Sequence, residues 1–270
     1  MGFEAAVAPV LVFKVNPPEW TGMTNIAVVA DDIELDAPTL VEGLPGLGLV
    51  GKIATDHLIE QFDMTYYAAV DCEGIPQIAV YEGGDRDLLP PVRFYADEER
   101  DLLALRSDVP ISSEAAPQFA RCVTSWVDSH DATPLYLSGL PHQKQAGEVP
   151  ELYGTATGDF GQLLDEHDIG SPSETGAISG PTGALLHRAS RSGVGAIGLI
   201  VESDPRFPDP EAARILLKDA IDPIAGIDVN TDELVESAEE IREQKEQFAQ
   251  RMQETEEAES SQAKPLRMFQ

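Results

Sequence analysis

Cysteine is scarce in this sequence, which has only Cys72 and Cys122 among its 270 residues. The two form no Cys-x-x-Cys pair and no cluster with histidine, so we expect neither a disulfide framework nor a structural zinc site. The five histidines also lack the His-x-x-His, His-x-x-x-His and His-Glu-x-x-His spacings of metal-binding helices. Metal binding therefore has no support in the sequence.

Long hydrophobic runs are also missing. No apolar stretch approaches the length of about 18 residues that a membrane-spanning helix needs. The opening MGFEAAVAPV lacks the basic region of a secretion signal, and Ala6 stands where N-myristoylation needs Ser or Thr. We therefore expect a soluble, cytoplasmic protein with no membrane partner.

Positively charged residues are also few. The chain has 18 Lys and Arg residues against 48 Asp and Glu, which gives a net charge of −30 at pH 7. Nucleic acids bind proteins by pairing phosphate with Lys and Arg, so we expect no nucleic-acid partner. The carboxylates are spread along the whole chain, a pattern associated with salt-adapted organisms, in which salt screens their repulsion. We expect a halophilic protein, and an ordinary acidic protein is the alternative.

The sequence has enough apolar material for a folded core, with 42% hydrophobic residues. Segments rich in Val, Leu and Ile alternate with segments of helical spacing, and this alternation predicts an α/β fold of αβα layers with a largely parallel sheet. We expect strands near residues 5–15, 25–35, 40–41, 65–71, 77–81, 101–110 and 134–141, helices near 49–62, 113–130, 160–166 and 210–221, and a unit of strand, glycine turn, helix and strand over 177–203.

The composition changes sharply near the C-terminal end. Between Asp232 and Glu259 there is no Gly or Pro, and 11 acidic residues stand against 3 basic ones. A thin heptad-like apolar stripe predicts a long helix that forms a coiled coil or packs on the protein's own body. We therefore divide the chain into an α/β domain (1–228), an acidic helix (229–259) and a flexible tail (260–270).

A first glycine motif runs from Gly43 to Lys52. Gly46, Gly48 and Gly51 have the Gly-x-Gly-x-x-Gly spacing of a dinucleotide-binding turn, and Asp71 follows 20 residues later. Two interpretations stay open: the glycines bind an anion, or they let a helix approach a strand closely. Pro45 suits the turn in either case. Ile53 stands where a P-loop needs Ser or Thr for magnesium, which argues against nucleotide hydrolysis.

A second glycine motif, Gly176, Gly180 and Gly183, occupies a similar position between a strand and a helix. Ser179 and Thr182 could donate hydrogen bonds to a phosphate or simply cap the helix. The sequence contains no Gly-x-Ser-x-Gly nucleophile motif and no evident Cys–His pair, so catalysis has no positive signal.

The run Leu40-Val-Glu42-Gly43-Leu-Pro45-Gly-Leu-Gly-Leu-Val-Gly51, together with the later glycine turn that leads into IGLIVES, resembles the archaeal branch of the proteasome assembly chaperone 2 family. The resemblance covers roughly residues 5–225, and Glu42 and Pro45 make it more specific than a generic glycine motif. It implies an αβα fold similar to that of nucleoside phosphorylases, no cofactor, a homo-oligomer and a protein that acts through interactions, with proteasome α-subunits as partners.

The last three residues, Met268, Phe269 and Gln270, agree with this resemblance. Proteasome activators and assembly chaperones commonly end in a hydrophobic residue, a tyrosine and any final residue, and here Phe replaces Tyr. We expect a non-enzymatic, ATP-independent chaperone or activator whose tails dock on the α-ring of the proteasome core. The alternatives are a phosphorylase-like or dinucleotide-binding enzyme, and an oligomer held by the acidic helix with an unremarkable tail.

Overall fold

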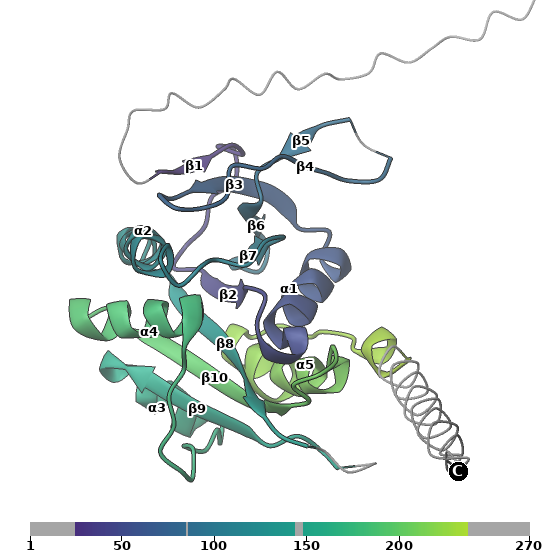
Figure 1. The fold of residues 1–270 in the computed structure, drawn as a ribbon, viewed down its shortest axis with the longest axis vertical. Coiled ribbons are helices and arrows are strands. Elements are labelled where there is room, and N and C mark those ends of the chain that lie inside the picture. Colours follow the sequence, from purple (N-terminus) through teal and green to yellow (C-terminus); the bar gives the residue numbers. More distant parts are fainter. Residues whose placement is uncertain (1–24, 85, 144–147, 237–270) are drawn as a thin grey trace, which may run out of the picture.

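The computed structural model describes residues 25–84, 86–143 and 148–236, which form an eight-stranded sheet with helices on both faces (Figure 1). The strands lie in the order β1-β3-β6-β7-β2-β8-β10-β9, with a separate hairpin of β4 and β5. Their bounds are Asn25–Val28 (β1), Thr39–Gly43 (β2), Thr65–Asp71 (β3), Val80–Tyr81 (β4), Leu88–Leu89 (β5), Val92–Asp97 (β6), Leu102–Ser107 (β7), Thr133–Pro141 (β8), Leu152–Thr157 (β9) and Ala196–Ser203 (β10).

The sheet is mixed, which corrects the expectation of a largely parallel one. β2 pairs in parallel with β7 and β8, and β8 with β10, but the pairs β1–β3, β3–β6, β6–β7 and β9–β10 are antiparallel. For the pairs β3–β6 and β6–β7, the reason is that these strands follow one another without an intervening helix. A parallel connection needs a long crossover, usually a helix, whereas shorter hairpin connections produce antiparallel neighbours.

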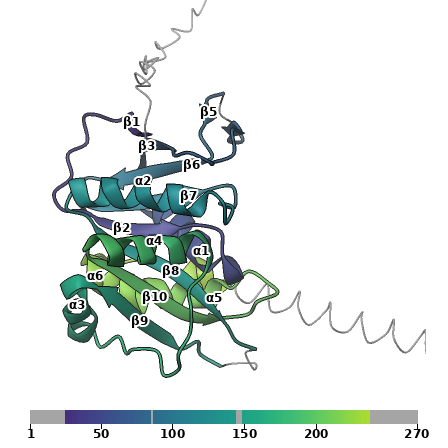
Figure 2. The same cartoon turned by 60° about the vertical axis from the view of Figure 1, so that its left-hand side comes forward.

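The helices form two layers. One face of the sheet carries α2 (Ala116–Ser129) and α4 (Gly180–Ser192), which lie side by side in Figure 2. The other carries α1 (Val50–Gln61) and α5 (Pro210–Leu216), and α5 continues through a π-turn (Leu217–Ile221) into α6 (Asp222–Ala225). The short α3 (Gly161–Glu166) packs against β9. The αβα layering is therefore observed.

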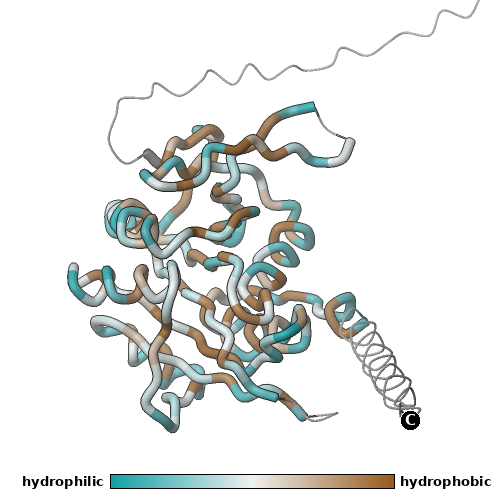
Figure 3. Tube along the Cα trace, viewed as in Figure 1, coloured by the Kyte–Doolittle hydropathy of each residue, from teal (hydrophilic) through white to brown (hydrophobic). Residues whose placement is uncertain are grey.

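Each layer encloses its own hydrophobic core. Phe94, Phe119 and Tyr136 belong to the core under α2 and α4, whereas Leu58 and Leu216 belong to the core under α1 and α5. Figure 3 shows the hydrophobic residues, in brown, gathered along the central strands. At about 25 cal/mol for each Å² of apolar surface removed from water, these two cores are the main source of folding free energy.

The helical spacing of apolar residues in the sequence correctly predicts which residues of these helices are buried. In α1, Val50, Ala54 and Leu58 recur every four residues and face the sheet, and in α2 Phe119 and Val123 do the same. Side chains four residues apart lie on one face of a helix, which is why this spacing predicts burial. The helices expected near 49–62 and 113–130 are confirmed.

The strand expectations are confirmed only in part. The structure matches the expected strands at 65–71 and 134–141 and shortens the one at 77–81 to β4 and the one at 25–35 to β1. It adds β5, β6 and β9, which the sequence pattern did not reveal, and residues 177–179, expected to be a strand before the second glycine turn, do not form one. The expected strand at 5–15 lies outside the described residues. Residues 232–236 are helical, and the rest of the expected acidic helix and the tail lie outside the described residues.

Cys72 and Cys122 form a disulfide bond, which corrects the expectation of none. Cys72 directly follows β3, and Cys122 lies on α2, which covers that part of the sheet. Their Cα atoms are 6.2 Å apart although 50 residues separate them in the chain, and both residues are buried. Two isolated cysteines carry no spacing signal, so only the tertiary fold reveals that they meet.

Candidate functional site

The first glycine motif forms a tight connection between β2 and α1. A Cβ added at Gly43 would lie 1.7 Å from Thr55 Oγ1, and one at Gly48 would lie 1.9 Å from Ser203 Oγ. At Gly51 a Cβ would be 3.1 Å from the Glu42 carbonyl oxygen. Gly48 also has φ +63°, in the left-handed region that favours glycine. Close packing alone therefore accounts for glycine at these three positions, and no bound ligand is needed to explain them.

Glu42 is the polar residue at the centre of this connection. It is the fourth residue of β2, and no part of it is exposed to solvent. Its carboxylate accepts hydrogen bonds from the backbone N–H of Leu137 at 2.9 Å, the backbone N–H of Leu44 at 3.2 Å and Thr182 Oγ1 at 3.0 Å. The Leu137 contact fixes Glu42 to β8, and the Thr182 contact fixes it to the first turn of α4.

Burial dominates the electrostatics of Glu42. It raises the pKa of the carboxyl group to about 7, because the charged form is costly away from water, and the three hydrogen bonds only partly oppose this. The neighbouring Tyr136 is also buried, and its pKa is raised first by burial and then by the charge of Glu42. At a pH near this pKa, some of the protein molecules therefore carry Glu42 protonated and the others carry it charged.

The second glycine motif meets the first through Thr182. Gly180 has φ +69°, and a Cβ at Gly183 would lie 2.1 Å from the Ile178 carbonyl oxygen, so the turn before α4 also depends on glycine. Ser179 occupies the N-cap of α4 without a side-chain capping bond. The hydrogen bond from Thr182 thus joins two motifs that lie 140 residues apart in the sequence.

This geometry does not form a dinucleotide site. In the dinucleotide fold the acidic residue ends a strand adjacent to the glycine turn, but Asp71 ends β3, which β6 and β7 separate from β2. Lys52, expected as a possible anion ligand, instead pairs with Asp56 at 2.6 Å. A phosphate at either turn would also approach the buried carboxylate of Glu42, which repels it whenever it is charged.

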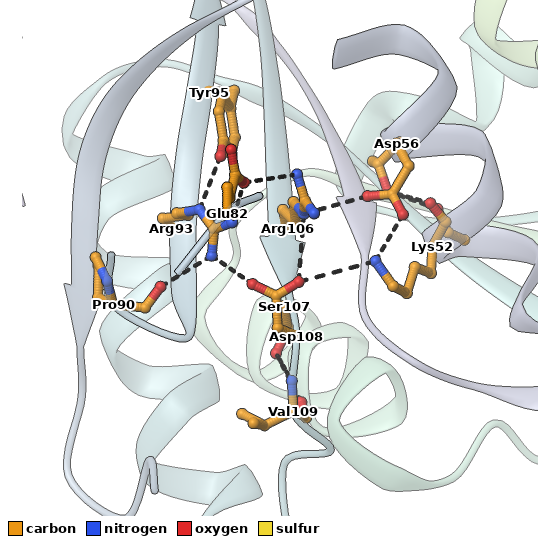
Figure 4. Close-up of polar contacts among 12 residues, drawn as sticks. Lys52, Asp56, Glu82, Pro90, Arg93, Tyr95, Arg106, Ser107, Asp108 and Val109 are labelled. Carbon is orange, nitrogen blue, oxygen red and sulfur yellow. Dashed lines mark hydrogen bonds and ion pairs between the residues drawn. The ribbon is translucent and has the colours of Figure 1, made fainter. Parts of the chain in front are cut away.

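An ion-pair network beside α1, shown in Figure 4, is the feature that sequence reasoning missed. At its centre is Arg93 on β6, which has no exposed surface and pairs with Asp108 at 2.5 Å and Glu82 at 3.2 Å. Arg106 on β7 pairs with Asp56 at 3.3 Å and Asp108 at 3.4 Å. The network balances three cations, counting Lys52, with three carboxylates, and it fastens the β4–β5 hairpin to the sheet through Glu82.

A cavity of about 840 Å³ lies on the α4 side of the sheet, over β8, β10 and β9. It is separate from the buried carboxylate and contains Gly176 and Gly183 of the second glycine motif among its lining residues. Within the described ranges, no three metal-ligating side chains come together, and no helix there is long and apolar enough to cross a bilayer. Met268, Phe269 and Gln270 lie outside the described residues.

Together, the mixed sheet with helices on both faces and the two glycine turns joined by a buried glutamate define an α/β protein of αβα layers. The sequence profile of the PAC2 family matches residues 40–249. The chain belongs to the PAC2 family.

Several relatives share most of the chain. Two proteins of Methanocaldococcus jannaschii, MJ0106 and MJ1210, are 29% and 30% identical to it, and each alignment spans 77% of this chain and more than 80% of the relative. The crystal structure of Pyrococcus furiosus PbaA, described as an archaeal homolog of proteasome-assembly chaperone, is 26% identical. It superposes with a TM-score of 0.70 over 88% of this chain and 96% of PbaA. Pyrococcus furiosus PbaB, described as an archaeal proteasome activator, shares the fold with a TM-score of 0.69 at 22% identity, covering 84% of this chain and all of PbaB.

Proposed function

We propose that this protein is a non-enzymatic, ATP-independent assembly chaperone or activator that docks its C-terminal tail on the α-ring of the proteasome core particle. The observation that carries the proposal is membership of the PAC2 family together with the likeness to PbaA over nearly the whole of both chains. The described residues add a consistent point, because close packing accounts for Gly43, Gly48, Gly51 and Gly183 of the two turns without a nucleotide.

The tail supplies the contact in this proposal. Phe269 inserts its ring into an apolar pocket between two α-subunits, and the free α-carboxylate of Gln270 pairs with a lysine at the rim of that pocket. Burying an aromatic side chain contributes on the order of 1.5–3 kcal/mol. Tyrosine at this position would add a hydrogen bond worth about 0.5–1.5 kcal/mol, so Phe269 lowers the affinity without abolishing it.

Oligomerisation makes weak tails effective. When one tail of a homo-oligomer is bound, the others are held near the ring at an effective concentration of the order of millimolar, provided that their spacing matches the pockets. A loss of affinity in each single tail therefore causes a larger loss in the affinity of the whole homo-oligomer for the ring.

The test is binding of the full chain to purified archaeal proteasome α-rings by surface plasmon resonance. We expect Phe269→Ala to weaken binding at least tenfold, residues appended after Gln270 to do similar damage, and Phe269→Tyr to bind as tightly as the parent or more tightly. Phe207→Ala is the matched control, since it removes a ring from the loop between β10 and α5 and should leave binding unchanged. If all variants bind like the parent, the tail is not the contact.

A further inference from the structure

The cavity on the α4 side is a formed pocket with three kinds of wall. The strands β8, β10 and β9 make its floor, the inner residues of α4 make one side, and the segment 172–178 makes another. Its volume of about 840 Å³ falls within the range of roughly 300–1,000 Å³ typical of small-molecule sites. Figure 2 shows α4 lying over the strands that form this floor.

The charged groups of the cavity are mainly acidic. Glu202 on β10 and Glu174 line it, and only 13% of the Glu202 side chain is exposed. His142 lies between Glu202 and Glu148, at 3.5 Å and 3.3 Å, and His187 lines the α4 side. Among the described lining residues there is no Lys or Arg, so a phosphate or carboxylate ligand would find no permanent positive charge there.

The remaining surface of the cavity is apolar or carries hydroxyl groups. Leu186, Ile178 and Ile200 offer aliphatic surface, and Ser138 and Ser190 offer hydroxyl groups. A ligand that matches both properties carries a positive charge for the carboxylates and a short aliphatic stem for the apolar wall. Lys and Arg side chains have this form, and so do free polyamines.

We propose that this cavity binds an organic cation, an ammonium or guanidinium group on an aliphatic stem, with Glu202 contacting the charged end. The ligand has two available sources, a free polyamine or a Lys or Arg side chain of a protein segment. One such segment is part of this chain, because residues 260–270 contain Lys264 and Arg267 and no acidic side chain. Binding of a cation in this cavity does not require docking of the tail on the proteasome.

The probe is spermidine, titrated into the full chain by calorimetry at fixed ionic strength. We expect saturable binding that weakens at least tenfold in Glu202→Gln and in Gly176→Phe. Gly176 lines the cavity, and a Cβ there would meet nothing within 4 Å, so the phenylalanine fits without a backbone clash and fills space. Gly170→Phe is the matched control, because Gly170 is equally open but does not line the cavity.

These variants separate specific binding from general attraction to an acidic protein. Gly176→Phe keeps all the charges, so non-specific binding of a polyamine would persist in it. A full-length variant with both Lys264→Gln and Arg267→Gln identifies the source of the cation. Tighter spermidine binding in that variant indicates that the chain's own segment competes for the cavity, and unchanged affinity indicates a free cation.

Three results would overturn the proposal. The first is that spermidine shows no saturable binding either to the parent chain or to the variant with both Lys264→Gln and Arg267→Gln. The second is that the parent and Gly176→Phe chains bind spermidine with equal affinity. The third is that the parent chain binds adenosine monophosphate more tightly than spermidine. A melting curve for each variant shows that it is folded. None of these readouts involves the α-ring, so failure here and failure of tail docking are distinguishable.

Discussion

Glu42 and Arg93 are both fully buried charged residues, but their surroundings differ. Arg93 has two carboxylates beside it, whereas the hydrogen bonds to Glu42 come from two backbone N–H groups and one hydroxyl. A buried charge with a partner keeps its charge, and one without a cation shifts its pKa toward the neutral form. This is why the pKa of Glu42 rises while Arg93 remains a cation.

The raised pKa of Glu42 predicts a specific pH dependence of stability. The pKa is about 7 in the folded protein, against 4.5 for an ordinary glutamate, so between these values the folded chain holds a proton that the unfolded chain has released. Stability is therefore lost as the pH rises through this window, by up to about 3 kcal/mol. Glu42→Gln removes this titration.

We expect the free energy of unfolding of the parent, relative to Glu42→Gln, to fall between pH 4.5 and pH 8. Urea denaturation of both chains at several pH values measures it, and taking the difference cancels the titration of the other carboxylates. Parallel curves for the two chains would show that the pKa of Glu42 does not differ between the folded and the unfolded chain.

Two glycines of the first motif are expected to differ in how much the same substitution destabilises the protein. Gly48→Ala must accept a positive φ and a contact of 1.9 Å with Ser203 Oγ, and we expect it to lower the free energy of unfolding by about 2 kcal/mol or more. Gly46→Ala has its nearest contact at 3.9 Å and an extended backbone, so we expect a change within about 0.5 kcal/mol. Chemical denaturation of both variants measures this, and equal losses would contradict the packing role of Gly48.

At the scale of elements, the disulfide ties the end of β3 to α2. A bond that closes a loop of 50 residues restricts the unfolded chain, which typically stabilises the folded state by about 2–4 kcal/mol. Both sulfur-bearing residues are buried, which limits the access of reductants to the bond.

We expect the variant with both Cys72→Ser and Cys122→Ser to lose about 2–4 kcal/mol of unfolding free energy. The same loss should follow when dithiothreitol is added to the unfolded parent chain, whereas the double variant should not respond to it. A thiol titration of the denatured, non-reduced parent should detect no free cysteine. Detection of two free thiols would show that the bond does not form.

The elements that sequence patterns revealed are helices whose apolar residues recur at helical spacing, such as α1 and α2, and strands with a continuous buried run, such as β3. β6 was missed because Arg93 and Asp97 are charged residues on a strand whose every residue is buried. The carboxylates that pair with Arg93, Glu82 and Asp108, lie outside the strand, so the strand's own sequence does not reveal them. The strand directions of the sheet were missed because they depend on which strands become neighbours. The residues around the glycine turn could be named from the sequence, but the hydrogen bond between Thr182 and Glu42 is a tertiary contact that no local pattern encodes.

At the scale of the whole molecule, the distribution of charge is the dominant feature. Lys52, Arg93, Arg106 and Lys218 are all held in ion pairs with carboxylates. After all 18 Lys and Arg residues are counted against the 48 carboxylates, an excess of 30 negative charges remains. Self-repulsion of this size destabilises the compact state in dilute buffer.

If the acidity is an adaptation to salt, the melting temperature should rise between 0.1 M and 1 M KCl. The Debye length falls over this range from about 10 Å to about 3 Å, which screens repulsion between surface carboxylates. Scanning calorimetry across the range measures the shift, with sucrose at matched osmolality as the control for excluded-cosolute effects. A melting temperature that stays flat or declines would count against halophilic adaptation.

The strand order also divides the sheet into two blocks that are contiguous in the sequence. β1, β3, β6, β7 and β2 all come from residues 25–107, and β8, β10 and β9 all come from 133–203, so the pairing of β2 with β8 is the seam between them. During synthesis the first block emerges before β8, so a sheet formed by its strands at that stage has the edge of β2 without its neighbour. Glu42 lies on that edge and, while it is solvated, carries a charge that discourages pairing with another nascent chain. The carboxylate that destabilises the folded protein as the pH rises thus opposes association of the partly synthesised chain.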